Sequence, residues 1–561
     1  MNRHLRKGKL LRVFLISSLF AVALFFSGRY FVYYKIKQTV EKELASLSKQ
    51  GIFVRYDNLE VDPWIGALEV YNLSVKVRKD SATVTGEHGL EAQLPFIQVK
   101  GVQLIPFIRN KTLVVREIYS HKTSVNYTLQ ATLFKSAGNG KRKVELQNVV
   151  VDRVDLPDID VYLNDIGTGD TVAHILTDVN MQSLLLSKQL DSLTWRRGNV
   201  EVTNLAMNYN KANYALAVKR IHLGITDRSI RLDSLLIKPT LDRQAFMRAK
   251  GRQTNFMETR IPHLEIQGID WYTFPKPTLQ MDRIDLTLLM TMYRDKRLPF
   301  LQRDDRPLPS HFLQRLPLRL KIDTVTIRDS FVSYEEMPEG GDSTGLVFFD
   351  NLNATIMNLH NDRKVKVDTR MHAVASFMGA GRLDAHFTFP YDTLNRYRVA
   401  GTLQDMPLTR INRILGAAAQ AKVESGTMRD LRFNFTYNNT RSDGEVEMNY
   451  ENLRVLTLRE NKKNEQSVSV VKTILLNAFV IRKDMDENVK EEKRKGEIQF
   501  YRDTKKSVFN FWWKSILDGI KAAYNLDKLP LKGNLEEKKR KRKNRSLKET
   551  WSKIFDKDKD E

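Results

Sequence analysis

The sequence predicts a mostly β protein with few helices, in which a curved antiparallel sheet follows one N-terminal transmembrane helix. Three observations lead to this class. Short alternations of apolar and polar residues, broken by Asn, Asp, Gly and Pro, extend from residue 50 to about residue 480, and this period of two is typical of strands. Helical periodicity is confined to a few segments. One long apolar run lies near the N-terminus.

The apolar run, residues 13–34, is the first expected element. As a helix it measures roughly 33 Å at about 1.5 Å per residue, which is enough to cross a hydrocarbon core of about 30 Å. Cations crowd residues 1–12 before it, and this predicts a cytoplasmic basic N-terminus and a signal anchor with the bulk of the chain on the far side. The alternative is a cleavable signal peptide, for which a clear small-x-small cleavage site is lacking.

One short pattern recurs through the alternating region: two apolar residues in alternation, a polar pair, then two more apolar residues in alternation. Strict copies begin at Val54, Ile97, Leu264, Leu279, Leu320 and Met448. A bulge at the polar pair would return the later apolar residues to the same face and bend the strand, so that the sheet has a continuous apolar concave side. Alternatively, the pair is a hairpin turn, as at Asp57–Asn58 or Asp350–Asn351.

Helical patterns occur at residues 407–421 and in an amphipathic segment, residues 501–530. In the latter, one face combines Phe509, Trp512, Trp513, Ile516 and Ile520. Trp beside Lys is typical of helices at a membrane surface, so we expect membrane-surface contact here; the alternative is packing against the sheet. Residues 531–561 form a basic tail that we expect to be disordered, and its run Lys538–Arg545 would attract anionic headgroups.

The composition limits the function. The 561 residues include 91 Lys and Arg, 67 Asp and Glu and no Cys, for a net charge of +24. Without Cys there is no disulfide, thiolate zinc site, iron–sulfur cluster or Cys nucleophile, and this usage fits a bacterial periplasm. The positive charge predicts anionic partners, either nucleic acid or lipid headgroups. The anchor directs the basic tail away from the cytoplasm, so we expect no nucleic-acid partner, and a nucleic-acid-binding protein is the least favoured alternative.

Catalytic and metal-binding patterns are weak. Gly341–Gly345 matches G-x-S-x-G, but a nucleophile elbow needs a strand before the Ser and a helix after it, so we expect a loop. His372 and His386 fall on separate expected strands and read as packing or surface positions rather than ligands. The cluster Asp155, Asp158 and Asp160 lacks the glycine turn of a calcium loop. We expect no enzyme, catalytic residue, metal or cofactor.

Two stretches carry a family resemblance. Gly66–Val75 (GALEVYNLSV) follows the anchor and the first alternating segment. Residues 401–450 then combine a strand, a short helix, the Ser-Gly-x-hydrophobic sequence Ser425–Met428 and two further strands. This order resembles AsmA-like proteins, which are relatives of TamB and of the chorein-type bridge-like lipid transfer proteins.

The resemblance implies an elongated, taco-like β-groove over residues 35–500, which projects from the bacterial inner membrane into the periplasm. Its apolar side would shield and move acyl chains of phospholipid or another envelope lipid in cell-envelope biogenesis, with envelope assembly proteins as further partners. The expected groove lining is Val54, Tyr56, Ile97, Val99, Leu320 and Ile322. Two alternatives stay open. One is a closed sandwich core with no ligand, and the other is a non-enzymatic scaffold for envelope or outer-membrane assembly, its groove filled by its own side chains or a partner strand.

Overall fold

The computed structural model describes most of the chain between residues 52 and 523. It leaves out 63–64, 79–87, 129–146, 166–167, 190–191, 271–277, 302–303, 363, 391–395, 420 and 458–491, and it also describes the helical residues 34, 37, 38 and 41. The expected basic N-terminus, nearly all of the expected transmembrane segment and the basic tail lie outside the described residues. None of the helices among the described residues combines the length and the apolar content that crossing a membrane requires.

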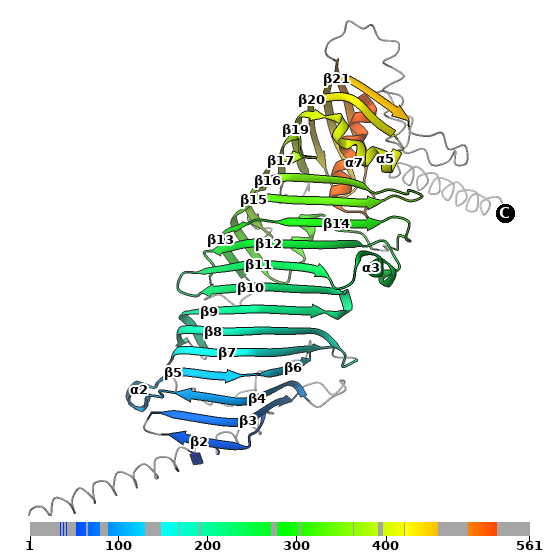
Figure 1. Cartoon of the computed structure of the whole chain (residues 1–561). Coiled ribbons are helices and arrows are strands. Elements are labelled where there is room, and N and C mark those ends of the chain that lie inside the picture. The colour runs from blue at the N-terminus through cyan, green and yellow to red at the C-terminus, as the bar shows by residue number, and fades with distance from the viewer. Residues whose placement is uncertain are drawn as a thin grey trace, which may run out of the picture. The chain divides into compact units, whose positions relative to one another are not determined.

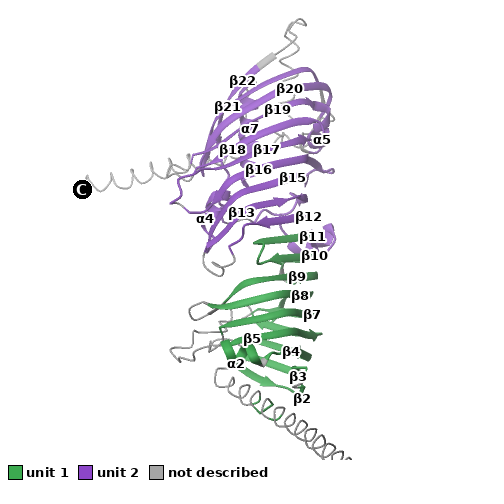
Figure 2. Ribbon diagram, turned by 90° about the vertical axis from the view of Figure 1, so that its left-hand side faces the viewer, with its two compact units in different colours: residues 1–235 green, residues 236–561 purple. Residues whose placement is uncertain are grey.

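The mostly β class is confirmed. Strands make up 67% of the described residues and helices 14%, and the 22 described strands belong to one mixed sheet. By contact density the chain divides into two compact units, residues 1–235 and residues 236–561 (Figure 2). We describe the two units one at a time.

Unit 1 is built almost wholly from strands, which lie side by side like rungs (Figure 1). Its elements are β1 (Ile52–Arg55), β2 (Asn58–Asp62), β3 (Ala67–Arg78), β4 (His88–Lys100), α2 (Leu104–Asn110), β5 (Thr112–His121), β6 (Ser124–Thr128), β7 (Asn148–Asn164), β8 (Thr171–Gln189), β9 (Ser192–Tyr209), η2 (Asn210–Ala212), β10 (Tyr214–Gly224) and the start of β11 (Ser229–Pro239). From β7 to β10 the strands pair antiparallel with the next strand in the chain.

Two of the rungs in unit 1 are broken strands. Both β1 and β2 pair antiparallel with β3. Likewise β5 and β6 pair antiparallel with β4, but on their other edge both pair with β7 in the parallel direction. The expectation of a wholly antiparallel sheet is therefore wrong here, because β5 and β6 run in the same direction as their neighbour β7.

Unit 2 adds more helix to the same kind of sheet. Its elements are α3 (Arg243–Lys250), β12 (Asn255–Gln267), β13 (Thr278–Leu286), β14 (Leu289–Asp295), α4 (Pro309–Gln314), β15 (Arg319–Met337), β16 (Gly345–His360), β17 (Thr369–Phe377), β18 (Gly381–Phe389), β19 (Tyr397–Pro407), η3 (Leu408–Ile411), α5 (Asn412–Ala419), β20 (Ala421–Tyr437), β21 (Arg441–Thr457), β22 (Glu492–Tyr501) and α7 (Val508–Ala523). The expected helix at residues 407–421 corresponds to η3 and α5.

Unit 2 repeats the broken-strand arrangement of unit 1. Strands β13 and β14 pair antiparallel with β12 and parallel with β15, just as β5 and β6 pair with β4 and β7. From β15 to β22 the printed pairings are antiparallel. The same topological module of a long strand, a broken strand and a second long strand thus occurs once in each unit.

The hairpin alternative is wrong at both positions named for it, because neither polar pair joins two strands that pair with each other. Asp57 lies between β1 and β2, which face one partner strand, and Asn72 of that strand donates to the Asp57 carboxylate at 2.7 Å. Asp350 and Asn351 lie inside β16, where the register shifts. Asn72 and Asn351 have φ values of 52° and 48°, a left-handed conformation that Asn tolerates better than most residues.

Bulges on neighbouring strands are tied together by side chains. In unit 1, Asp178 of β8 accepts from the backbone N–H of Asp158 in β7 and from the Asn204 amide in β9, both at 2.9 Å. Asp158 and Asn204 themselves have φ values of 56° and 54°. A bulge bends its strand, so a line of bulges across adjacent strands bends the sheet along one line.

The main core of the described residues lies in unit 2, between the last strands of the sheet and helix α7. Its fully buried side chains include Tyr397, Phe435, Val446, Ile498 and Phe511. Ser507 begins the helix, since its hydroxyl accepts from the N–H of Asn510 at 3.3 Å and so satisfies one of the free donors of the first turn. Unit 1 has a much smaller buried cluster, made of Val115, Val151, Val154 and Leu184.

Candidate functional site

An unbroken apolar row crosses the sheet of unit 1. Residues that face each other on adjacent strands point to the same side, so the strand register identifies the row directly. It consists of Val54, Val75, Ala92, Val125, Val161, Ile175, Met207 and Leu216. A second row on the same face consists of Val61, Leu68, Val99, Ile118, Val154, Met181, Val200 and Leu223.

The first row is not enclosed in a core, whereas in the second row Val154 and Val200 are buried and Val154 belongs to the small buried cluster of unit 1. Every member of the first row is half-buried. Between residues 52 and 235 the only described α-helix is α2, which itself exposes Ile105 and Ile108 by 77% and 73%. No second layer made of described residues covers the face of unit 1. A soluble sheet normally buries its apolar face against another layer, so this face is available for an apolar occupant.

The opposite face of the same strands is polar. Lys76 of β3 and Glu91 of β4 face each other and form an ion pair at 2.8 Å. Farther along, Tyr162 stacks on His174 with ring centroids 4.5 Å apart, and both side chains reach the Asp160 carboxylate. The sheet of unit 1 therefore has one apolar and one polar face, as alternation along each strand predicts.

Three of the six expected lining residues lie on the apolar face of unit 1. Val54 and Val99 belong to the first and second rows, and Ile97 pairs with Val70 between them on the same face. Tyr56, at the end of the break between β1 and β2, is half-buried, and burial raises its phenol pKa. In unit 2, Leu320 and Ile322 share one face of β15, where Leu320 is half-buried and Ile322 is only 4% exposed.

In unit 2 a comparable row runs along the strands from β12 to β22. It consists of Ile266, Ile284, Val325, Ile356, Met371, Phe387, Val399, Phe435, Gly444 and Ile498. Helix α7 covers the last part of this row, because Trp512 packs 4.8 Å from Phe387 between ring centroids and Gly519 lies against Ile498. The apolar face of unit 2 is therefore closed at its C-terminal end by the chain itself.

This packing changes the interpretation of the amphipathic helix. Trp512, Ile516 and Ile520 pack against the core beneath α7 and do not form a free surface. Phe509 and Trp513 are exposed, by 71% and 47%. The expected membrane-contact face thus divides into three residues that the sheet occupies and two that remain outside.

Unit 2 contains a basic pocket beside the strands β12 and β14. Met290, Met292 and Arg294 alternate along β14 and so share one face. Arg294 lines a pocket of about 250 Å³ together with Arg252, Arg306, Phe300, Leu301 and the segment Gln253–Asn255. The lining contains three guanidinium groups and no carboxylate.

Arg294 of this pocket is incompletely paired, although its side chain hydrogen-bonds to Tyr334. The buried Nε of Arg294 has no hydrogen-bond partner, and its guanidinium lies 5.7 Å from the centre of the Phe300 ring. Burial, together with the charge of Arg294, lowers the pKa of Arg306. Buried N–H groups without acceptors are costly, and clustered guanidiniums repel one another. An anion with several acceptor oxygens would relieve both costs.

The remaining motifs have structural positions in the described sheet. Gly341–Gly345 connects β15 to β16, so the loop expectation is correct and no helix follows the serine. Asp158 and Asp160 take part in the bulge and the His174 contact described above. His372 and His386 lie on the adjacent strands β17 and β18 as expected, but they meet directly across the pair, together with Asp384.

Sequence reasoning missed the basic pocket and the role of Asp384. The pocket residues come from the approach to β12, the end of β14 and the loop after it, and only the pairing of those strands brings them together. The spacing of Asp384 and His386 by two residues on an expected strand was the available signal, because it places both on one face. Comparison with protein-family models gives no match, and comparison with curated proteins finds no related chain either.

Proposed function

We propose that this protein binds lipids through their acyl chains on the apolar face of its sheet, and shields and moves them as a membrane-anchored, AsmA-like protein of the bacterial cell envelope. The observation that carries the proposal is the row from Val54 to Leu216, in which every residue is apolar and every one is half-buried. A row made for a closed core would be enclosed by a second layer of the fold.

The energetics favour an acyl chain as the occupant. A chain of about 15 methylenes loses about 12 kcal/mol when it enters water, at about 0.8 kcal/mol per methylene. At about 4.8 Å between strands, the row from β1 to β10 measures roughly 34 Å, so contact with apolar side chains continues over that distance. Movement along such a face needs no catalytic group, since each position offers nearly the same environment.

The basic pocket supports a lipid with an anionic headgroup. Met290 and Met292 offer apolar contact along β14, and Arg294 follows at the end of the same face beside Arg252 and Arg306. A phospholipid has this order of groups, because its acyl chains adjoin a phosphodiester. We place the phosphate at the arginines and the chains on the apolar face.

The cellular setting is part of the proposal. The apolar run at residues 13–34 would anchor the chain in the inner membrane, with the sheet in the periplasm. Phe509 and Trp513 are exposed beside cationic residues, and we assign them to contact with a membrane surface. Other envelope assembly proteins would be the partners at the ends of the sheet.

The test is site-specific photo-crosslinking in a Gram-negative host. A photoreactive phenylalanine replaces Met207, which lies in the apolar row, or its neighbour Asn208, which is exposed on the polar face. After irradiation, the full-length protein is purified and examined for covalent lipid by mass spectrometry. We expect lipid adducts at residue 207 and none at residue 208.

Two other outcomes would contradict the proposal. Equal lipid labelling at both positions would mean that lipid contact is non-specific. A protein adduct at residue 207 without lipid would support the scaffold alternative, in which a partner strand fills the face.

A further inference from the structure

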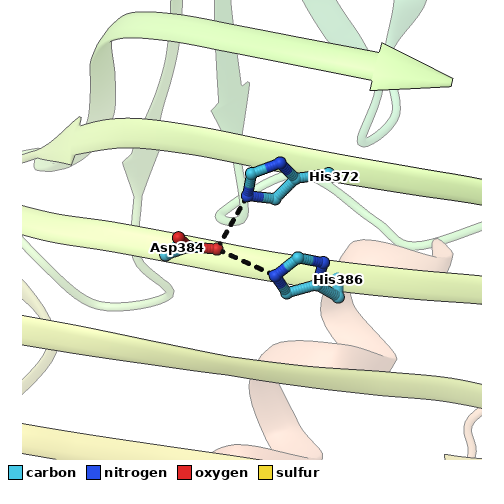
Figure 3. A group of neighbouring side chains, drawn as sticks. All are labelled: His372, Asp384 and His386. Atoms are coloured by element: carbon cyan, nitrogen blue, oxygen red, sulfur yellow. Dashed lines mark hydrogen bonds and ion pairs between the residues drawn. The ribbon is translucent and has the colours of Figure 1, made fainter.

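Two histidines and one aspartate meet on the polar face of unit 2 (Figure 3). His372 of β17 lies directly opposite His386 of β18 in the antiparallel register. Their rings are parallel within 2°, with centroids 4.2 Å apart. Asp384 precedes His386 by two residues on the same strand, so its carboxylate rises from the same face. All three side chains therefore stand on a paired and rigid part of the sheet.

The donor atoms of the three side chains converge. One carboxylate oxygen of Asp384 lies 2.9 Å from Nε2 of His372 and 3.3 Å from Nε2 of His386. The three potential ligand atoms all lie within 4.8 Å of one another. Around a tetrahedral zinc ion with bonds of about 2.0–2.1 Å, neighbouring ligand atoms lie roughly 3.3 Å apart. The side chains need only small rotations to reach that arrangement.

The site is open to solvent. The side chains of His372, Asp384 and His386 are 49%, 45% and 64% exposed, so an ion can enter and a water molecule can complete its coordination. Arg370 and Arg382 stand two residues before His372 and Asp384 on the same face, and the Arg382 guanidinium is held by the Gln404 side chain at 2.6 Å. The positive charges of Arg370 and Arg382 disfavour a nearby metal cation. Binding would therefore depend on direct coordination by the three side chains and not on the electrostatic potential around them.

We propose that His372, Asp384 and His386 bind one divalent transition-metal ion of the zinc class, through both Nε2 atoms and the carboxylate. Imidazole with a single carboxylate suits zinc, nickel or copper, whereas calcium and magnesium prefer oxygen donors throughout. Bound metal would connect β17 to β18 across their hydrogen-bonded ladder and so clip the two strands. The proposal is independent of lipid binding, since the cluster lies on the polar face.

The chain offers a matched control for this site. His174 of unit 1 also contacts an aspartate, Asp160, but its stacking partner is Tyr162 instead of a second histidine. It has the same His–Asp pair and lacks the third ligand. Among the described residues, His372, Asp384 and His386 are the one group of three such side chains that could hold a metal ion.

The experiment titrates Zn²⁺ into the chelator-treated, detergent-solubilised full chain and into the variants His372→Asn, His386→Asn and His174→Asn, using calorimetry. We expect each of the first two variants to lose one equivalent of binding or to weaken it at least tenfold, while His174→Asn keeps it. Co²⁺ supplies a second readout, because a tetrahedral site gives visible absorption bands that the first two variants should lack. Unchanged binding in His372→Asn, or an equal loss in His174→Asn, would overturn the proposal. Circular dichroism checks that the exposed substitutions leave the fold intact.

Discussion

Gly496 of β22 lies directly beneath Gly519 of α7, so that a β-carbon at residue 496 would overlap the carbonyl oxygen of residue 519. Gly519 in turn faces Val446 and Ile498. Helix backbone and sheet meet here without intervening side chains. This contact holds α7 close enough for Phe511 and Leu517 to be buried.

Replacing Gly496 with Ala should therefore displace α7 and lower the free energy of unfolding by about 1–3 kcal/mol, the usual cost of overpacking. Urea unfolding followed by tryptophan fluorescence measures this, because Trp512 and Trp513 lie on the helix. The control is Gly416→Ala in α5, where an added β-carbon meets no atom within 4 Å. It should be neutral or stabilising by about 0.5–1 kcal/mol, and equal losses in both variants would contradict the contact.

A charge on the apolar row should remove bound lipid. Leu216→Asp puts a carboxylate among half-buried apolar side chains, whereas Ala217→Asp puts it on the exposed side of the same strand, β10. Both variants change the charge equally. We expect co-purified lipid to fall at least fivefold in the first and to stay near the wild-type amount in the second, as measured by lipid mass spectrometry. Unfolding of Leu216→Asp alone would show that the row belongs to a closed core.

Neutralising the basic pocket should change which lipids bind. Arg294→Gln and Arg306→Gln each remove a guanidinium from the pocket, while Arg260→Gln removes one from the exposed side of β12. We expect the pocket variants to lose several-fold in affinity for vesicles of anionic phospholipid and little for neutral diacylglycerol. The surface variant should behave like the wild type. A uniform loss in all three variants would mean that only net charge matters.

Lys514 of α7 should make stability depend on pH. Burial above all, with a smaller effect of nearby Lys296 and Lys506, lowers its pKa from 10.5 to about 8. Between about pH 8 and pH 10.5 the unfolded chain then holds more protons than the folded chain, so stability due to this group rises with pH. Thermal unfolding of Lys514→Met should lack that rise and exceed the wild type at pH 7. The exposed neighbour Lys505→Met should keep the wild-type slope.

The recurring pattern predicted the strand class, and at some copies a bulge, because both depend on local periodicity. At Asn351, for example, two consecutive polar residues inside an alternating strand call for a bulge, and Asn accommodates the left-handed conformation found there. At the copies that begin at Ile97 and Leu264 the polar pair ends the strand instead. The direction in which two neighbouring strands pair does not follow from local periodicity. Alternation along β13 is the same whether its neighbour runs parallel or antiparallel, so the parallel pairing with β15 was not predictable from it.

Sites that depend on register were also beyond the sequence. His372 and His386 were recognisable as strand residues, yet their contact requires the register between β17 and β18. Whether Trp512 packs on the sheet likewise depends on its contact with Phe387, which lies more than a hundred residues earlier in the chain. An amphipathic pattern predicts that a helix has an apolar face, but it does not distinguish lipid from a sheet as the surface that covers it.

Each unit contains one broken strand between two long strands. This arrangement affects how the protein unfolds. Each strand in the printed pairings contacts the strands beside it and little else in the sheet, so stability accumulates from nearest-neighbour terms as it does in repeat proteins. A fold of this kind can open in part while the rest stays ordered. The breaks β5–β6 and β13–β14 interrupt the ladder on both of their edges. Hydrogen exchange should therefore find the boundaries between cooperative blocks at these two places, with the antiparallel stretches β7–β10 and β15–β22 exchanging as units.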